Sequence, residues 1–145
     1  MEKSPFEQFE ELKIDIVSGS FLTEIAKWAN FLAILGYIGL GLMILAAVSI
    51  IIVGSSVSIG PIGSGIWISV IYILFAGIYF FPITYLYKFS SNMKIALRTN
   101  DQKSLTNAFE YLKSHYKFIG IITIIILGFY ILAIAGAIMT TLGQA

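Results

Sequence analysis

The distribution of charged side chains is the feature that most constrains this chain. From Trp28 to Tyr87 the sequence contains no Asp, Glu, Lys, Arg or His, and the same holds from Phe118 to Ala145. A helix of about 20 apolar residues is long enough to cross a bilayer. The first run must therefore fold back on itself, whereas the second has the length of one crossing. Because 58% of the 145 residues are hydrophobic, we expect an integral membrane protein.

The first uncharged run is interrupted at GSSVSIGPIGSG, residues 54–65, where Gly, Ser and Pro replace the aliphatic residues. Such a cluster indicates a turn. We therefore predict three spans, at about 28–53, 66–87 and 118–139, each roughly 33 to 39 Å long at 1.5 Å per residue. The expected fold class is all-α, an integral membrane three-helix bundle. Alternation of apolar and polar residues, which a membrane β-barrel requires, is absent from these segments.

The basic residues predict the orientation in the membrane. All nine lie before the first span or between the second and third, and two crossings place those regions on one side. Lys and Arg in short loops concentrate on the cytoplasmic side. We therefore expect a cytoplasmic N-terminus and a C-terminus that is periplasmic or extracellular. The acidic start, MEKSPFEQFEELKIDI, lacks the apolar core of a secretory signal, so the first span is expected to remain in the mature protein.

The segment 88–117, between the second and third spans, continues the helical pattern of both. Its apolar residues recur every three or four positions on each side of Thr99 to Asp101, which is a turn signal. Thr99 with Gln102 matches a capping box for a new helix. We therefore predict that both spans extend into a cytoplasmic antiparallel helical hairpin, whose first arm is open to a kink at Pro82. The residues predicted to form the hairpin seam are Leu86, Phe89, Met93, Leu105, Phe109 and Leu112.

The N-terminal segment, 1–20, is distinguished by its net negative charge from the membrane domain, 21–145. Its apolar residues follow helical spacing up to Leu12 and strand-like alternation from there to Ile16, so both structures remain open. An N-cap at Ser20 predicts that the first long helix begins one residue later. Charge complementarity suggests that the acidic segment lies on the basic hairpin.

Two runs suggest a family. IAKWANFLAILGYIGLGLMIL, followed after the second span by LYKFSSNMKIALRTNDQKSLTNAFEYLKSHYKFIGI, resembles a group of small bacterial multi-span inner-membrane proteins of uncharacterised function. The resemblance covers roughly residues 21–139, and its features are AKWA at the first span and the Leu and Phe ladder of the hairpin. None of these is a catalytic motif. The resemblance implies a bacterial membrane setting and no activity.

The sequence offers little material for catalysis. His115 is the only histidine, there is no cysteine, and Glu110 is five residues from the histidine. A catalytic metal site normally needs three protein ligands, so we expect no metal and no cofactor. His115 would suit a proton relay or pH sensor, although a polar residue at the membrane boundary is the simpler interpretation. The Ser and Thr residues of the spans have no ionisable partner for hydrolysis or ion coupling. We therefore expect no enzyme.

Small residues and lysines mark two kinds of contact. Small residues let membrane helices approach closely, either within this protein or between it and other subunits. Lysines at the boundary can reach anionic lipid headgroups, whereas the basic cluster is too small and too neutralised to predict nucleic-acid binding. The candidate helix-association residues are Ala29, Ala33, Gly36, Ala133, Gly136 and Ala137, and the candidate headgroup contacts are Lys88, Lys113 and Lys117.

Together these features favour a non-enzymatic structural or accessory protein of the bacterial inner membrane. We expect it to contact membrane lipids and to associate with itself or with subunits of a larger envelope complex. The alternative is a small oligomeric channel or transporter, whose pathway would form between protomers and be lined by Ser, Thr and Gly.

Overall fold

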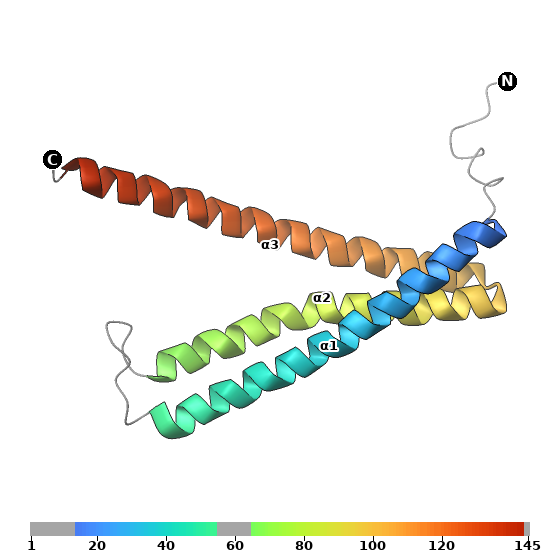
Figure 1. Cartoon of the computed structure of the whole chain (residues 1–145), viewed down its shortest axis with the longest axis horizontal. Helices are drawn as coiled ribbons and strands as arrows, with labels where there is room; N and C mark the ends of the chain where they lie inside the picture. Colours follow the sequence, from blue (N-terminus) through green and yellow to red (C-terminus); the bar gives the residue numbers. More distant parts are fainter. Residues whose placement is uncertain (1–13, 55–64, 144–145) are drawn as a thin grey trace.

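The computed structural model describes residues 14–54 and 65–143. These residues form three α-helices, α1 (Ile16–Gly54), α2 (Gly65–Thr99) and α3 (Gln102–Gly143), shown in Figure 1. Each helix is long and apolar enough to cross a membrane. A helix satisfies its backbone hydrogen bonds internally, which the lipid interior requires. The prediction of an all-α protein with three membrane-spanning helices is therefore confirmed.

The start of α1 lies earlier than the sequence suggested. Asp15 caps the helix: its Oδ1 accepts a hydrogen bond from the Ser18 backbone N–H at 3.0 Å, and its carbonyl oxygen accepts one from Gly19 at 2.9 Å. The expected cap, Ser20, instead donates its hydroxyl to the carbonyl of Val17 inside the helix. A carboxylate both accepts the free N–H groups and complements the positive end of the helix dipole. The expected strand or helix within residues 1–13 lies outside the described residues.

The turn between α2 and α3 follows the predicted position with a different cap. Asn100 has a φ of 51°, a left-handed conformation that Asn adopts more readily than most residues. The Asp101 carboxylate accepts hydrogen bonds from the backbone N–H groups of Lys103 and Ser104 at 3.2 and 3.0 Å. Thr99, the expected cap, donates its hydroxyl to the carbonyl of Ile95. The predicted capping box is therefore wrong, and an Asp cap reverses the chain.

α1 and α2 lie side by side because α1 presents small side chains to its neighbour. Ala29 and Ala33 are buried, and a Cβ atom on Gly36 would lie 2.9 Å from Cγ1 of Ile83. Close approach increases the dispersion contacts that hold membrane helices together. Other small buried residues of the two helices are Ala26, Ala47, Gly65, Ser69, Ala76, Ser90 and Ala96.

α3 packs on α2 only near the hairpin end. From Thr123 to Gly143 every side chain of α3 is exposed, and Figure 1 shows α3 diverging from the other two helices toward its C-terminal end. An apolar opening, here called the wedge, therefore separates the span of α3 from the α1–α2 pair. At the mouth of the wedge α3 presents the bulky Phe118, whose ring lies 6.0 Å from that of Phe81 on α2, and not the small residues with which α1 approaches α2.

Candidate functional site

The three helices meet at the hairpin end in one buried cluster, here called the junction. Its buried members come from all three helices, and α2 supplies the two large ones, Phe89 and Met93. Burial of these side chains fixes the hairpin against the first turns of α1. The junction consists of Ala26, Ala29, Phe89, Met93 and Ala108, with Leu22, Leu86, Leu97, Leu105, Tyr111 and Leu112 packed against it.

Five of the six residues predicted for the hairpin seam belong to the junction or pack on it, and Phe109 does not. Phe109 is 45% exposed, whereas its neighbour Ala108 is fully buried. An alanine at this position lets α3 approach α2, whereas a phenylalanine would force them apart. Ala108 follows Leu105 by three residues and precedes Leu112 by four, so the same helical spacing contains the signal that was missed.

Two polar contacts join the helices within the junction. The Ser90 hydroxyl, which is buried, donates a hydrogen bond of 2.7 Å to the carbonyl oxygen of Ala26 on α1. Lys88 places its Nζ atom 5.2 Å from the centre of the Tyr111 ring on α3, within the range of a cation–π interaction. Lys88, a candidate headgroup contact, thus already has a partner within the chain.

A second polar link ties α1 to α2 one level further from the hairpin. Thr84 donates its hydroxyl to the carbonyl of Phe80 at 2.8 Å, so the Tyr37 hydroxyl, 3.1 Å away, donates to Thr84 Oγ1. The Tyr37 ring also lies 6.2 Å from that of Tyr87, at an edge-on angle. A buried hydroxyl that finds an acceptor avoids the cost of an unpaired polar group in lipid.

His115 connects α3 to α2 at the mouth of the wedge. Its Nδ1 atom lies 2.8 Å from the carbonyl oxygen of Pro82. Figure 1 shows α2 bending near its middle, and Pro82, inside α2, lacks the N–H that a straight helix needs. The histidine therefore holds α3 at a part of α2 where the regular helix is perturbed.

These contacts also fix the relative heights of the helices. His115 is level with Pro82, six residues beyond Lys88 along α2, or about 9 Å at 1.5 Å per residue. Ile83, next to Pro82, touches Gly36, nine residues beyond Lys27 along α1, or about 14 Å. Lys113 and Lys117, on either side of His115, thus lie opposite the uncharged parts of α1 and α2.

The two small-residue faces have different environments. The α1 face, Ala29, Ala33 and Gly36, packs on α2, so its role in packing within the chain is observed. The α3 face contains Ala133, Gly136 and Ala137, and a Cβ atom on Gly136 would have no neighbour within 4 Å. Among the described residues nothing covers this face.

The register leaves the α3 face beyond the reach of α2. α2 begins at Gly65, 17 residues before Pro82 (82 − 65). Because α3 runs antiparallel to α2 and His115 is level with Pro82, the residue of α3 level with Gly65 is Leu132, 17 positions after His115 (115 + 17). Residues 133–143 of α3 therefore extend past the start of α2 even if the wedge were closed. Figure 1 shows the C-terminal end of α3 reaching beyond the ends of the other helices.

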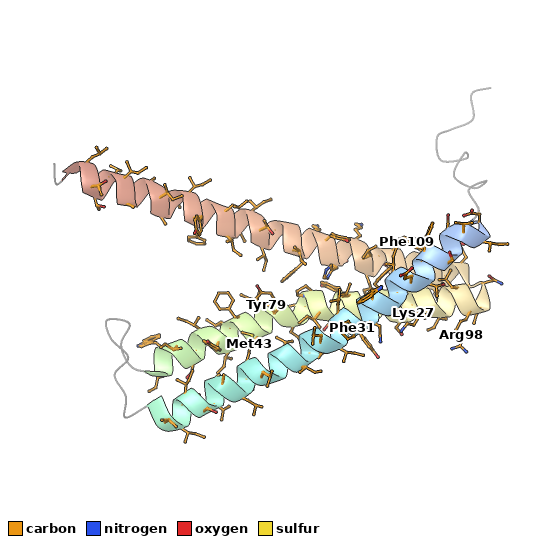
Figure 2. The ribbon with its side chains drawn as sticks, in the orientation of Figure 1. Lys27, Phe31, Met43, Tyr79, Arg98 and Phe109 are labelled. Atoms are coloured by element: carbon orange, nitrogen blue, oxygen red, sulfur yellow. The ribbon has the colours of Figure 1, made fainter. Side chains whose placement is uncertain are left out.

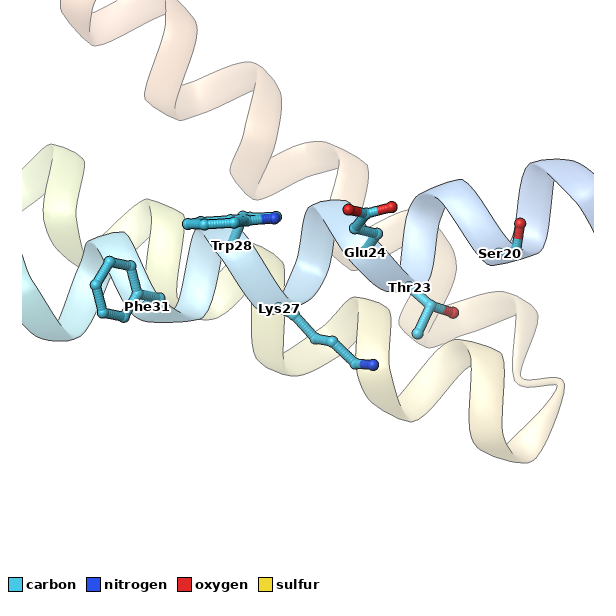
Figure 3. A pocket seen from close by; sticks show the side chains of 6 residues that line it. All are labelled: Ser20, Thr23, Glu24, Lys27, Trp28 and Phe31. Carbon is cyan, nitrogen blue, oxygen red and sulfur yellow. The ribbon is translucent and has the colours of Figure 1, made fainter.

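The side chains of α1 near the junction form a shallow surface of mixed character. Figure 3 shows Glu24 and Trp28 on one side of the helix, with Lys27 pointing away from them. The Trp28 and Phe31 rings lie edge to face, 6.0 Å apart. Aromatic and charged side chains together are typical of a helix at a membrane–water boundary.

Several polar groups of the described residues have their partners within their own helix or helix cap. No group of three His, Asp or Glu side chains lies close enough to hold a metal ion in the described part of the chain. The span hydroxyls of Ser49, Ser69 and Thr123 each donate to a carbonyl one turn earlier in their own helix. The lowered pKa values of Asp15 and Asp101 arise mainly from hydrogen bonds with Ser18 and Ser104, within the helix caps.

No protein-family model matches this chain, and neither the curated proteins nor the solved structures contain a match. The geometry of the three helices is therefore the guide to function. That geometry consists of a packed junction at the basic end and an unpacked third span. Figure 2 shows the side chains of that span projecting on all sides of α3.

Proposed function

We propose that this chain is a non-enzymatic structural or accessory membrane protein that associates with other copies of itself through the span of α3. The observation that carries the proposal is the isolation of that span. Its side chains are exposed from Thr123 to Gly143, and its small-residue face lies beyond the start of α2. The face that would pack on another helix is therefore available to a second copy.

The spacing of the small residues suits a close helix contact. Ala133 and Ala137 are four residues apart, as are Gly136 and Thr140, so all four share one side of α3. Small residues at four-residue spacing are a recurrent surface for helix dimers in membranes. Ala135 is two residues from both Ala133 and Ala137 and therefore lies on the opposite side of α3.

The proposed setting is the bacterial inner membrane, with the α2–α3 turn in the cytoplasm and the junction at the cytoplasmic membrane boundary. The first turns of α1 and the α2–α3 turn lie at the same end of the molecule (Figure 1). The basic residues that the structure describes lie at this end or between it and Lys117, the one farthest along α3. An excess of Lys and Arg favours the cytoplasmic side. The bacterial origin rests on the resemblance described above.

The alternative of an oligomeric channel has less support. A pathway between protomers would need hydroxyls that are free to line it, and those of Ser49, Ser69 and Thr123 donate to their own helices. We therefore do not propose a transported species.

The mass of the full chain in native nanodiscs tests the association. We expect a mass of two or more copies, and we expect Ala133→Leu with Ala137→Leu to give mainly the monomer, because large side chains prevent close approach. Ala135→Leu, which adds the same bulk on the opposite side of α3, should leave the oligomer intact. A monomer for the unmodified chain would contradict the proposal, and so would equal masses for all three proteins.

A further inference from the structure

A groove lies on the side of the junction where α1 and α3 face each other across α2. It has a volume of about 520 Å³. Apolar side chains from all three helices line it, among them Ile25, Leu32, Leu86 and Leu112. Ile25 and Leu32 are about half exposed, so the groove is an open apolar surface that needs an apolar occupant.

The groove has an aromatic residue on each side. Trp28 of α1 and Tyr116 of α3 both line it, and they are 60% and 67% exposed. Such side chains prefer the level of lipid headgroups, where one part of the ring is apolar and another meets water. The groove therefore lies at the level where a phospholipid headgroup joins its acyl chains.

The wedge continues the groove toward the bilayer centre. From Phe118 onward α3 offers only uncharged residues, and it diverges from α1 and α2 (Figure 1). An acyl chain that enters the groove can therefore extend along α3 past Phe118 without meeting a charged side chain.

Lysines lie next to this path at an unusual depth. Lys113 precedes Tyr116 by three residues and Lys117 follows Lys113 by four, so they adjoin the groove on the surface of α3. Both are exposed, and the contact of His115 with Pro82 places them opposite uncharged parts of α1 and α2. A lysine at such a depth needs its ammonium group to reach an anion or water. Helical side chains lean toward the N-terminus of their helix, which on α3 is toward the hairpin.

We propose that the groove between α1 and α3 binds a phospholipid with a net negative headgroup. One acyl chain runs from Leu32 and Leu112 past Tyr116 into the wedge, and the phosphate lies at the ammonium groups of Lys113 and Lys117.

The charge around the groove favours a net negative headgroup over a zwitterionic one. Near this level the chain carries Lys27, Lys88, Lys113 and Lys117 against the acids Glu24 and Glu110. Figure 3 shows Glu24 on the same side of α1 as Trp28, so it borders the groove, and the lysines of α3 outnumber it. Lys27 points away from Trp28 (Figure 3) and Lys88 contacts Tyr111. The positive charge nearest the wedge therefore comes from Lys113 and Lys117, which lie farther from the hairpin end than either acid.

Fluorescence quenching tests the proposal, because Trp28 and Trp67 are the only tryptophans. In the full chain, Trp67→Phe leaves Trp28 as the reporter at the groove. The protein is placed in phosphatidylcholine vesicles that contain a fixed fraction of a lipid with bromine on its acyl chains. This brominated lipid is phosphatidylglycerol in one set of vesicles and phosphatidylcholine in the other. We expect the phosphatidylglycerol to quench Trp28 with a higher relative association constant, by about fivefold for each lysine charge that contacts the headgroup.

Two charge-matched variants locate the source of the preference. Lys113→Gln with Lys117→Gln should reduce the ratio of the two association constants to about one. Lys94→Gln with Lys103→Gln removes two charges from the remote part of the hairpin and should leave the ratio unchanged. Trp28→Phe, which leaves Trp67 at the start of α2, should show no preference.

Three results would overturn the proposal. Equal quenching of Trp28 by the two brominated lipids would show that ordinary bilayer lipid fills the groove. Weak quenching by both lipids would show that a second copy of the chain fills it. A preference that survives the loss of Lys113 and Lys117 but disappears in Lys27→Gln would assign the anion to α1 instead.

Discussion

The Nδ1 atom of His115 lies 2.8 Å from the carbonyl oxygen of Pro82. A carbonyl oxygen can only accept, so Nδ1 is the protonated nitrogen in this contact. The bond joins α3 to α2 where the two helices begin to diverge, and it sets the register that leaves the end of α3 unpaired. The only histidine of the chain thus acts as a structural link between two spans.

Loss of this link should change the wedge. His115→Ala should broaden the distribution of distances between the spans of α2 and α3, since a hydrogen bond of this kind contributes about 1 kcal/mol. Double electron–electron resonance can measure this distribution of distances with spin labels on cysteines introduced at Leu74 and Ile126, because the chain has no native cysteine. Ser114→Ala, whose hydroxyl donates within α3, is the control. An unchanged distribution in His115→Ala would contradict the role given to the link.

Adjacent residues on α3 should differ sharply in their tolerance of charge. Ala108→Asp places a carboxylate in the junction and should lower the free energy of unfolding by about 3 kcal/mol. Phe109→Asp should cost less than about 1.5 kcal/mol, because Phe109 is about half exposed. Denaturant titration of the protein in mild detergent measures both values. A larger effect at Phe109 would restore the seam that the sequence predicted and contradict the observed packing.

Two glycines of α1 should respond oppositely to the same substitution. Gly36→Ala would place a Cβ atom 2.9 Å from Ile83, and Ile83 is too stiff to move freely, so we expect a loss of about 1 to 2 kcal/mol. Gly39→Ala meets no neighbouring atom and should be neutral or stabilising by up to about 1 kcal/mol. The same titration measures both.

The clash at Gly36 should be relieved by shortening its neighbour. In a double-mutant cycle, Gly36→Ala should cost less in the background of Ile83→Ala than in the native chain. If Gly36→Ala lowers the free energy of unfolding equally in both backgrounds, the close approach of α1 and α2 at Gly36 is not the cause of the destabilisation.

The Asp101 cap should make the α2–α3 turn sensitive to acid. Hydrogen bonds from the Ser104 side chain and backbone, in that order, lower the pKa of Asp101 below its ordinary value. A group with a lowered pKa in the folded state contributes stability that is present above its unfolded pKa and lost as the pH falls through the folded pKa. Ser104→Ala should therefore raise the pKa of Asp101, and its carboxyl carbon can be followed by NMR. A pKa that does not move, or that falls, would contradict the assigned cap.

The charge distribution predicted the helices because the membrane permits few alternatives. An uncharged run as long as that from Trp28 to Tyr87 has to form helices that return across the bilayer. The turn at Asn100 was likewise visible as a local signal. The residue that caps α3 could not be predicted, because Thr99 and Asp101 are both residue types that suit an N-cap. Which of them caps the helix depends on where the backbone changes direction.

The details of packing were harder to predict. Helical spacing of three or four residues allows a choice between Ala108 and Phe109, and the volume available between α2 and α3 decides it. The contact of His115 with Pro82 depends on the relative height of two helices, which local sequence does not contain. The divergence of α3 depends on how well its side chains pack on α2 in comparison with those of α1. That comparison involves residues from the whole molecule.

Disulfide formation between copies tests the association of α3 most directly. Ala137→Cys and Ala135→Cys introduce the same residue two positions apart, on opposite sides of α3, into a chain with no other cysteine. After mild oxidation of the full chain in native membranes, we expect Ala137→Cys to form a covalent dimer and Ala135→Cys to remain largely monomeric. Equal amounts of dimer from both variants, or none from Ala137→Cys, would contradict a dimer contact through the small-residue face of α3.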